Sequence, residues 1–391
     1  MKITARKAII GIIALVVIAA LLAGCTSKST ARGWAGVTKI DNTLVFTTIA
    51  GKIYSVDSAT GATLGSPVQL TVTSSGGFLS CGSSTSPISV YSSPIVSQDL
   101  VIFPGYNTGR IYAYPLVDGK LSSARRWAFP QDTSLNSNIV GGLALDTGKI
   151  YFSTANGMVY ALDAATGAEV WSPRNLNEQI WSAPAVSGNT IYITTFGKKL
   201  HALSTTDGSE KWSFETKGAM SASPIVDNGI VYVGDYDRHI YAVDANTGKE
   251  LWIFPGSNSD TEIPKNWFWT APITSGSDVF ASCLDGKVYI VDKTTGKFIN
   301  SVDVQNAIAA APALVDGALV VATIDLQNTK SKVFAIDTTN FASRQLTSFN
   351  EGIDARVFVD GNSIYIHTTS DNFYSINIQS GATQKISLTS S

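Results

Sequence analysis

The chain has 391 residues, and its 28 Lys and Arg against 30 Asp and Glu give a formal net charge of −2. Charged residues make up only 15% of the chain and form no basic cluster, which argues against a nucleic-acid-binding protein. The three histidines and three cysteines lack metal-ligand spacing, and no nucleophile elbow, phosphate loop or dinucleotide fingerprint occurs. We therefore predict no catalytic residue, no bound cofactor and no metal site.

The beginning of the chain has the pattern of a bacterial lipoprotein leader. A positively charged start is followed by an apolar run at 8–22 and by the lipobox Leu-Leu-Ala-Gly-Cys, which ends at Cys25. We predict a signal peptide at 1–24, lipidation of Cys25 and a short tether at 25–32. An uncleaved membrane anchor is the alternative, but the run is short for a spanning helix. Either way, the rest of the chain is expected outside the cytoplasm, on the periplasmic or cell-surface side of a bacterial membrane.

A phrase recurs in the middle of the chain at a nearly constant interval. Its copies end at Trp171, Trp212 and Trp252, so that successive copies are 41 and 40 residues apart. A period of this size indicates an array of small, similar structural units. Residues that recur with the unit are therefore interpreted first as structural.

The copy at 219–255 shows what one unit contains. Four runs rich in β-branched and aromatic residues, at 223–226, 230–233, 240–243 and 250–254, are separated by Gly, Asp and Asn turns. No segment after the leader shows helical periodicity. Each unit is predicted to be a four-stranded antiparallel sheet, with strands A to D in chain order, which is typical of a β-propeller blade.

The pattern occurs eight times, which predicts an all-β fold with a single eight-bladed β-propeller domain at 33–391. The aromatic anchors of the eight predicted third strands are Tyr54, Tyr112, Tyr160, His201, Tyr241, Tyr289, Phe334 and Tyr374. The first and last repeats each contain four strand patterns. A strand exchange that would close the ring is therefore not evident, and the closure mechanism stays open.

Insertions concentrate on one face of the predicted ring. The A–B and C–D turns stay short, whereas connections on the other face expand at 66–91, 130–139, 255–268 and 325–332. Loops on a rigid scaffold commonly carry function, and aromatic side chains are enriched among binding hot spots. The candidate binding face consists of Trp34, Tyr91, Trp181, Phe196, Tyr236, Trp267, Trp269 and Arg356. The alternative is that these rings fill gaps between blades.

Three smaller features have a structural and a functional interpretation. Cys81 and Cys283 could form a disulfide in an oxidising compartment, but two isolated thiols are the favoured interpretation. Asp235 and Asp237 could contribute to a calcium site, but two carboxylates are too few, and we interpret them as turn residues. His201 stands where most repeats have the anchor tyrosine, and we interpret it as a packing residue.

The recurring phrase resembles the tryptophan-docking motif of the quinoprotein (PQQ-like) propeller family, Ala-x-Asp-x-x-Thr-Gly-x-x-x-Trp. Residues 161–171 and 242–252 match it fully, and the copy ending at Trp212 matches it with two substitutions. The resemblance covers about residues 33–388 and implies that Trp171, Trp212 and Trp252 dock between neighbouring blades. The enzymes of this family carry an adjacent Cys–Cys pair and calcium beside the quinone. This chain has no adjacent cysteines, so we expect no quinone cofactor and no enzymatic activity.

In its lipobox, length and eight quinoprotein-type blades, the chain also resembles the BamB-type lipoproteins of outer-membrane protein assembly. This resemblance implies a non-enzymatic, monomeric scaffold in the cell envelope, whose partner is an envelope or membrane protein rather than a nucleic acid. Two alternatives remain. One is a small-molecule or glycan receptor that uses the aromatic channel mouth, and the other is a PQQ-dependent dehydrogenase.

Overall fold

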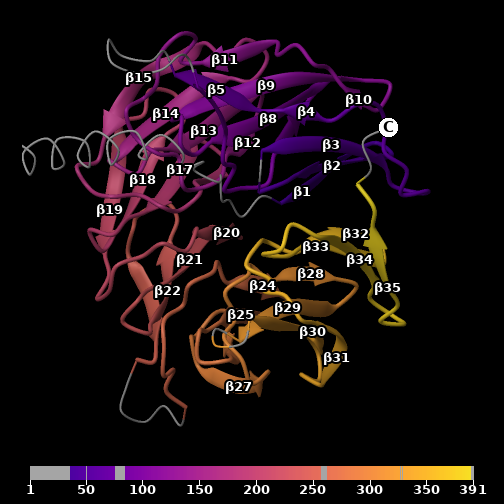
Figure 1. Ribbon diagram of the computed structural model, residues 1–391. Coiled ribbons are helices and arrows are strands. Elements are labelled where there is room, and N and C mark those ends of the chain that lie inside the picture. Colours follow the sequence, from indigo (N-terminus) through magenta and orange to yellow (C-terminus); the bar gives the residue numbers. More distant parts are fainter. Residues whose placement is uncertain are drawn as a thin grey trace, which may run out of the picture.

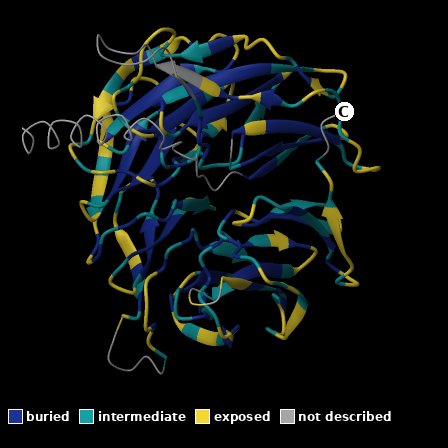
Figure 2. Cartoon of the chain, viewed as in Figure 1, coloured by how far each residue is buried: buried dark blue, intermediate teal, exposed yellow. Residues whose placement is uncertain are grey.

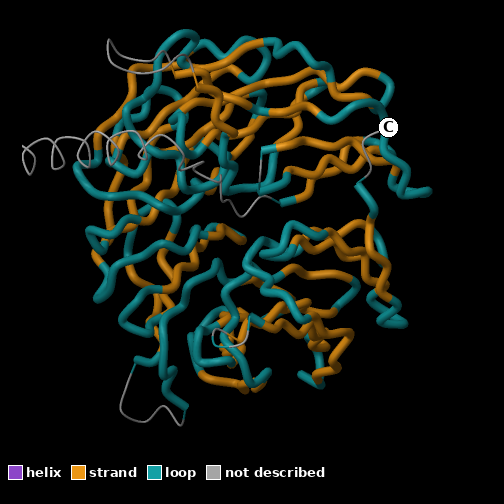
Figure 3. Tube along the Cα trace, viewed as in Figure 1, coloured by secondary structure: helices purple, strands orange, loops and turns teal. Residues whose placement is uncertain are grey.

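The computed structural model of the protein describes residues 36–49, 51–74, 84–256, 262–325, 327 and 329–388 (Figure 1). The predicted signal peptide at 1–24, the tether at 25–32 with Cys25, and the candidate residues Trp34 and Cys81 lie outside the described residues. The described residues form strands and loops (Figure 3), and they contain no helix long and apolar enough to span a membrane.

Eight antiparallel sheets follow one another along the chain, which confirms the predicted all-β, eight-bladed propeller. Blades one to four comprise β1 (Val37–Ile40), β2 (Thr43–Thr47), β3 (Lys52–Asp57) and β4 (Val68–Gln69); β7 (Ile95–Ser97), β8 (Leu100–Gly105), β9 (Arg110–Val117), β10 (Lys120–Leu121) and β11 (Trp127–Phe129); β12 (Ala144–Asp146), β13 (Lys149–Ser153), β14 (Met158–Asp163) and β15 (Glu169–Asn175); and β16 (Ala185–Ser187), β17 (Thr190–Thr194), β18 (Lys199–Ser204) and β19 (Glu210–Glu215).

The other four blades have the same strand order, with neighbouring strands paired in sequence. They comprise β20 (Ile225–Asp227), β21 (Ile230–Gly234), β22 (Ile240–Asp244) and β23 (Glu250–Phe254); β24 (Ile273–Ser275), β25 (Asp278–Ser282), β26 (Lys287–Asp292) and β27 (Phe298–Asp303); β28 (Ala313–Val315), β29 (Ala318–Asp325), β30 (Lys330–Asp337) and β31 (Ser343–Phe349); and β32 (Phe358–Asp360), β33 (Ser363–His367), β34 (Phe373–Asn377) and β35 (Thr383–Ile386). All eight predicted anchors lie in third strands.

Two of the predicted insertions contain more strand than the sequence suggested. The stretch 66–91 includes β4, the outer strand of blade one, and a separate hairpin of β5 (Thr71–Ser74) and β6 (Ser84–Pro87). The stretch 325–332 lengthens the hairpin of β29 and β30, which stay paired as far as Asp325 and Lys330. Interpreting these stretches as loops alone was wrong, because their polar residues pair along the backbone and do not need a buried face.

The hydrophobic core lies between neighbouring blades. The second strand β17 is buried along its whole length, because its two faces contact different blades. Val231 and Val233 of β21, for example, pack with Tyr192, Leu200 and Ala202 of blade four. The outer strands, such as β19, alternate towards solvent and carry most of the exposed strand residues (Figure 2). The core is therefore a ring of interfaces, each of which needs two blades.

A tryptophan lies at the outer edge of three of these interfaces, those that join blade three to four, four to five and five to six. The Nε1 of Trp212 in β19 donates a hydrogen bond of 3.1 Å to the carbonyl oxygen of Ala245 in blade five. The equivalent bonds join Trp171 to Thr205 at 3.3 Å and Trp252 to Lys293 at 3.0 Å. The three indoles thus lie between neighbouring blades.

A tight turn in the receiving blade makes room for each indole. In blade five, Oδ1 of Asp244 accepts hydrogen bonds from the backbone and hydroxyl of Thr247, at 2.7 and 2.8 Å. These bonds, that of the hydroxyl first, lower the pKa of Asp244. Gly248 then adopts a φ of +70°, and a Cβ on it would lie 2.7 Å from the ring of Trp212. Glycine is required here both by the left-handed backbone and by the close approach of the ring.

The sequence pattern missed two residues that make the same contact. Trp127 donates to the carbonyl of Ala164 at 3.2 Å, but it follows an interrupted outer strand, so the spacing of the phrase is lost. In blade seven, Arg344 pairs across from Ala335 as Trp171 does from Ala161, and it donates to the carbonyl of Ile378 at 2.6 Å. Arg344 therefore keeps the hydrogen-bond donor of the docking contact without its aromatic ring.

The ring closes by side-chain contacts between two complete blades, without strand exchange among the described residues. Phe46 of β2 and Phe373 of β34 meet edge to face, with their ring centroids 4.7 Å apart. Lys39 forms an ion pair of 2.5 Å with Asp360, and the backbone nitrogen of Ile49 donates to the carboxylate of Asp371 in the last blade at 2.9 Å. The closing interface therefore uses the same kinds of contact as the others.

We predict that Gly248→Ala destabilises the propeller more than Gly229→Ala. Both glycines have a positive φ, of +70° and +76°, but a Cβ on Gly229 would meet nothing within 4 Å. The difference between the two variants therefore isolates the overlap with the Trp212 ring, which we expect to cost about 1–3 kcal/mol. Denaturant unfolding followed by tryptophan fluorescence measures it. Equal free energies of unfolding for the two variants would show that the ring contact is not stabilising.

Candidate functional site

A channel runs through the centre of the ring, where the eight first strands converge. Its volume is about 790 Å³, and every blade contributes to its lining. Small and apolar residues predominate, as with Ala183 and Pro184, which lead into β16. Proline is tolerated at these positions because the inner strand is an edge, where a missing N–H costs no ladder bond.

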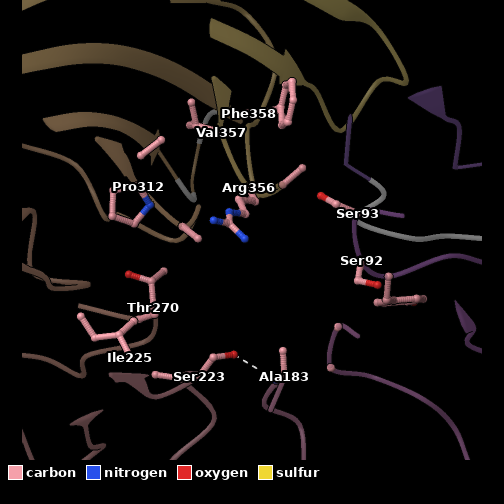
Figure 4. A pocket seen from close by; sticks show the side chains of 18 of the residues that line it. Ser92, Ser93, Ala183, Ser223, Ile225, Thr270, Pro312, Arg356, Val357 and Phe358 are labelled. Atoms are coloured by element: carbon pink, nitrogen blue, oxygen red, sulfur yellow. Dashed lines mark hydrogen bonds between the residues drawn. The ribbon is translucent and has the colours of Figure 1, made fainter. Parts of the chain in front are cut away.

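The channel holds little charge. Of the described residues that line it, Arg356 is the only basic one and Asp354 the only acidic one. Figure 4 shows the guanidinium of Arg356 pointing into the open centre, opposite Ser223 and Thr270. A single exposed cation in a mostly neutral lumen can attract an anion, but it cannot build a site for a cation.

Five aromatic side chains form a continuous row on the face that carries the B–C turns and D–A loops of blades four to six. We call this row the aromatic strip, and it consists of Trp181, Phe196, Tyr236, Trp267 and Trp269. Trp181 lies 4.7 Å from Phe196, and Phe196 lies 5.8 Å from Tyr236, both edge to face. Trp267 and Trp269 lie nearly parallel to Tyr236, with centroids at 4.6 and 5.8 Å.

Backbone hydrogen bonds hold the strip in place by tying loops to neighbouring turns. The nitrogen of Tyr236 donates to Ala219, in the loop before blade five, at 2.9 Å. In the next loop, the carbonyl of Trp267 accepts from Leu284 of blade six at 3.0 Å. The hydroxyl of Tyr236 donates to Ser221 at 2.6 Å, and burial raises the pKa of this tyrosine. The rings therefore sit on a hydrogen-bonded rim rather than on free loop ends.

The strip is partly open to solvent. The side chains of Trp181 and Trp267 are among the most exposed large hydrophobic residues, at 41% and 44%. Phe196, Tyr236 and Trp269 are half-buried. Trp181 and Trp269 also line the channel, so the strip borders the channel mouth. Gap filling between blades accounts for the half-buried rings but not for the two exposed indoles.

The other candidate residues do not join this strip. Tyr91 packs against Tyr106 on blade two, with centroids 4.1 Å apart, and lines the channel from there. Arg356 reaches the lumen from blade eight. The structure therefore divides the predicted binding face into the strip, the Tyr91–Tyr106 pair on blade two and a channel arginine, because the repeats place equivalent positions around the whole ring.

Asp235 is a structural residue, as the sequence analysis favoured. It is fully buried, and its carboxylate accepts hydrogen bonds from Gly218, Tyr241 and the backbone of His239, at 2.8–3.0 Å. Burial alone would raise its pKa, but the hydrogen bonds from His239, Gly218 and Tyr241 outweigh it and lower the pKa. The carboxylate thus anchors the turn that carries Tyr236. No group of three or more potential metal ligands occurs among the described residues.

Carboxylate partners of the histidines escaped the sequence analysis. His201 is buried as predicted, but Nδ1 lies 2.8 Å from Glu210 and Nε2 lies 3.3 Å from Glu178. Glu178 comes from the preceding D–A loop, 23 residues earlier in the chain, so no local spacing could reveal the contact. His367 likewise contacts Asp371 at 2.8 Å.

Cys283 is buried at the start of a B–C turn of blade six. Its thiol donates to the carbonyl of Asn266 at 3.1 Å, and burial raises its pKa to about 12. A thiol with this pKa is unreactive at neutral pH. That Cys81 and Cys283 are two isolated thiols stays a prediction, because Cys81 lies outside the described residues.

Comparisons with known proteins place this geometry in context. Residues 155–387 match the model of the family described as outer membrane protein assembly factor BamB. No match to a curated protein sequence is found.

Solved structures share the fold at low sequence identity. A computationally designed protein, Ika8, has a TM-score of 0.66 and 17% identity, covering 89% of this chain and 97% of its own. BamB from Moraxella catarrhalis has a TM-score of 0.64 and 14% identity, covering 87% and 93%. The quinohemoprotein alcohol dehydrogenase from Comamonas testosteroni has a TM-score of 0.61 and 16% identity, covering 76% and 66%. Since the family match spans more than half of the chain, this protein belongs to the family of the outer membrane protein assembly factor BamB.

Proposed function

We propose that this protein is a non-enzymatic scaffold of the bacterial cell envelope, which binds a membrane-protein partner through the aromatic strip. The single observation that carries the proposal is the continuity of the strip across three blades, with two indoles more than 40% exposed. Exposed tryptophan and tyrosine on a rigid support are the side chains most often found at binding hot spots. Membership of the assembly-factor family supports a partner that is itself a membrane protein.

The proposal includes attachment to the membrane. The lipobox that ends at Cys25 supports cleavage after residue 24 and lipidation of the cysteine, followed by a tether of a few residues. Such a tether would hold the monomeric propeller close to the bilayer surface, where a membrane-protein partner is accessible. The anchor and the strip are then two parts of one function.

The first test is capture of the partner from solubilised membranes by the tagged full-length protein. We expect Trp181→Ala/Trp267→Ala to reduce the captured amount by more than about tenfold, because each truncation removes a hot-spot ring. Leu251→Ala/Ile299→Ala is the matched control, since these side chains are exposed to a similar extent, 49% and 42%, on the outer strands of blades five and six. Undiminished capture by the tryptophan variant, with folding intact, would remove the strip from the function.

A second candidate function is a receptor for a small molecule or glycan at the channel mouth. Arg356 in the lumen and the rings of Tyr91, Trp181 and Trp269 at its border favour it. Stacking and one cationic contact could orient an anionic or sugar ligand there. This receptor function is the second candidate because the exposed indole of Trp267 does not line the channel.

The described channel residues do not fit a quinone–calcium centre. Calcium takes about six to eight oxygen ligands, usually with several carboxylates, and Asp354 is the only carboxylate among the described lining residues. A dehydrogenase activity is therefore not proposed, although enzymes with quinone cofactors share the fold.

We predict that addition of PQQ and calcium to the purified protein produces no reduction of an artificial electron-accepting dye with alcohol substrates. The physical reason is the missing set of oxygen ligands around the channel. Spectrophotometric dye reduction measures the activity, and a quinoprotein dehydrogenase assayed in parallel is the positive control. Turnover above that of the boiled protein would contradict the non-enzymatic assignment.

A further inference from the structure

Exposed cationic side chains surround the aromatic strip. Four exposed cations, Lys198, Lys217, Arg238 and Lys265, lie on the turns and loops of the same face. Lys198 and Arg238 are in the B–C turns of blades four and five, next to strip residues Phe196 and Tyr236. Lys217 and Lys265 are in the D–A loops that follow. In the described structure none of the four forms an ion pair with a carboxylate.

The acidic residues of this face are mostly engaged elsewhere. Glu178 is neutralised by Lys199 at 3.1 Å and contacts His201, and Glu262 pairs with Lys287 at 2.5 Å. Asp235 is buried and accepts three hydrogen bonds. Asp285 accepts hydrogen bonds from the backbone nitrogen of Lys265 at 2.9 Å and from the hydroxyl of Tyr289 at 2.8 Å, and Asp237 stays exposed beside His239. Lys198, Arg238 and Lys265 therefore face the solvent around the strip. Lys217 is also exposed, with its ammonium 3.5 Å from Nε2 of His239. The overall charge of the protein is slightly negative.

Backbone contacts make the cations and the strip one surface. Thr216, next to Lys217, donates through its backbone nitrogen to the carbonyl of Lys198 at 2.8 Å, which joins the first two cation-bearing segments. Phe268, in the loop of Lys265, donates to Asp235 in the turn of Arg238 at 3.3 Å. The cations thus have defined places on the rim and do not depend on independent loops.

We infer that the segment bound by the aromatic strip is an acidic, apolar peptide of a partner protein. The inference rests on the proposed function and adds the chemistry of the occupant. Leucine, valine or phenylalanine side chains of the peptide would cover the indoles of Trp181 and Trp267, while Asp and Glu side chains reach the surrounding cations. Complementary charge of this kind speeds association and selects among partners with similar apolar content.

An anionic membrane surface is the competing occupant, because aromatic and basic residues also suit lipid interfaces. The geometry favours the peptide. The rings pack against one another, and more than half of the Trp181 and Trp267 surface is covered. The strip also borders the mouth of a channel, so the surface is hollowed where a bilayer would be flat. A narrow extended segment follows such a surface better than a lipid layer does.

The test measures binding of the purified full-length protein to fluorescent synthetic peptides by anisotropy. Three peptides share one backbone of alternating Leu and Phe, with Glu, Gln or Lys at the intervening positions. We expect the Glu peptide to bind at least about tenfold more tightly than the Gln peptide, and the Lys peptide more weakly still. The preference should shrink as salt rises from about 0.05 M to about 0.5 M, because exposed charges are screened.

Two charge-reversal variants separate this surface from the overall charge. Lys198→Glu/Arg238→Glu should abolish the preference for the Glu peptide. Lys249→Glu/Lys297→Glu should leave it unchanged, since these exposed lysines lie on C–D turns at the opposite face and the change in net charge is the same. Unfolding curves of both variants show whether the propeller is intact.

The outcomes distinguish this inference from the proposed function. Equal binding of the Glu and Gln peptides, lost in both cases with Trp181→Ala/Trp267→Ala, would overturn the acidic preference and keep the strip as the docking site. Binding to phosphatidylglycerol vesicles, with no peptide bound, would assign the surface to a membrane and overturn the inference. Partner capture that survives both the tryptophan and the charge variants would overturn the proposed function as well.

Discussion

The contact on which the whole molecule depends is the one between an indole ring and a glycine of the next blade. A single blade buries only part of its apolar surface, and its middle strands are apolar on both faces, so two neighbours must cover it. The Trp212 ring rests on Gly248 while its nitrogen caps the carbonyl of Ala245. One side chain thus satisfies a backbone acceptor and fills the outer edge of the interface. The same contact recurs where Trp127, Trp171 and Trp252 meet the glycine of the next blade, and it sets the spacing of these blades.

The docking contacts and the candidate binding surface lie on opposite faces of the ring. The docking glycines Gly167, Gly208, Gly248 and Gly296 belong to C–D turns, and each of these turns receives a neighbour's ring. The B–C turns and D–A loops receive no such ring, and the connection between β23 and β24 carries Lys265, Trp267 and Trp269 without disturbing the packing of the blades. This separation allows the residues of the loop face to change without changing the blade contacts, and the fold is shared with proteins of 14–17% identity.

Much of the fold could be read from the sequence, because the relevant interactions are local or periodic. Strand runs, Gly and Asp turns and the phrase ending at Trp171, Trp212 and Trp252 predicted eight blades, and the third-strand anchors all lie where expected. The predictions failed where the period is broken. Trp127 and Arg344 make the docking bond without the motif, and β4 and the β5–β6 hairpin occupy a stretch interpreted as a loop.

The sequence by itself determined the repeating unit, the number of blades and the set of aromatic residues on one face, since strand periodicity and turn chemistry act within about 40 residues. Only the tertiary structure decided which of these residues meet. It joined Trp181, Phe196, Tyr236, Trp267 and Trp269 into one strip, left Tyr91 and Arg356 apart, and closed the ring through Phe46 and Phe373. The physical reason is that these contacts join different blades, and packing between blades selects them without any fixed spacing along the chain.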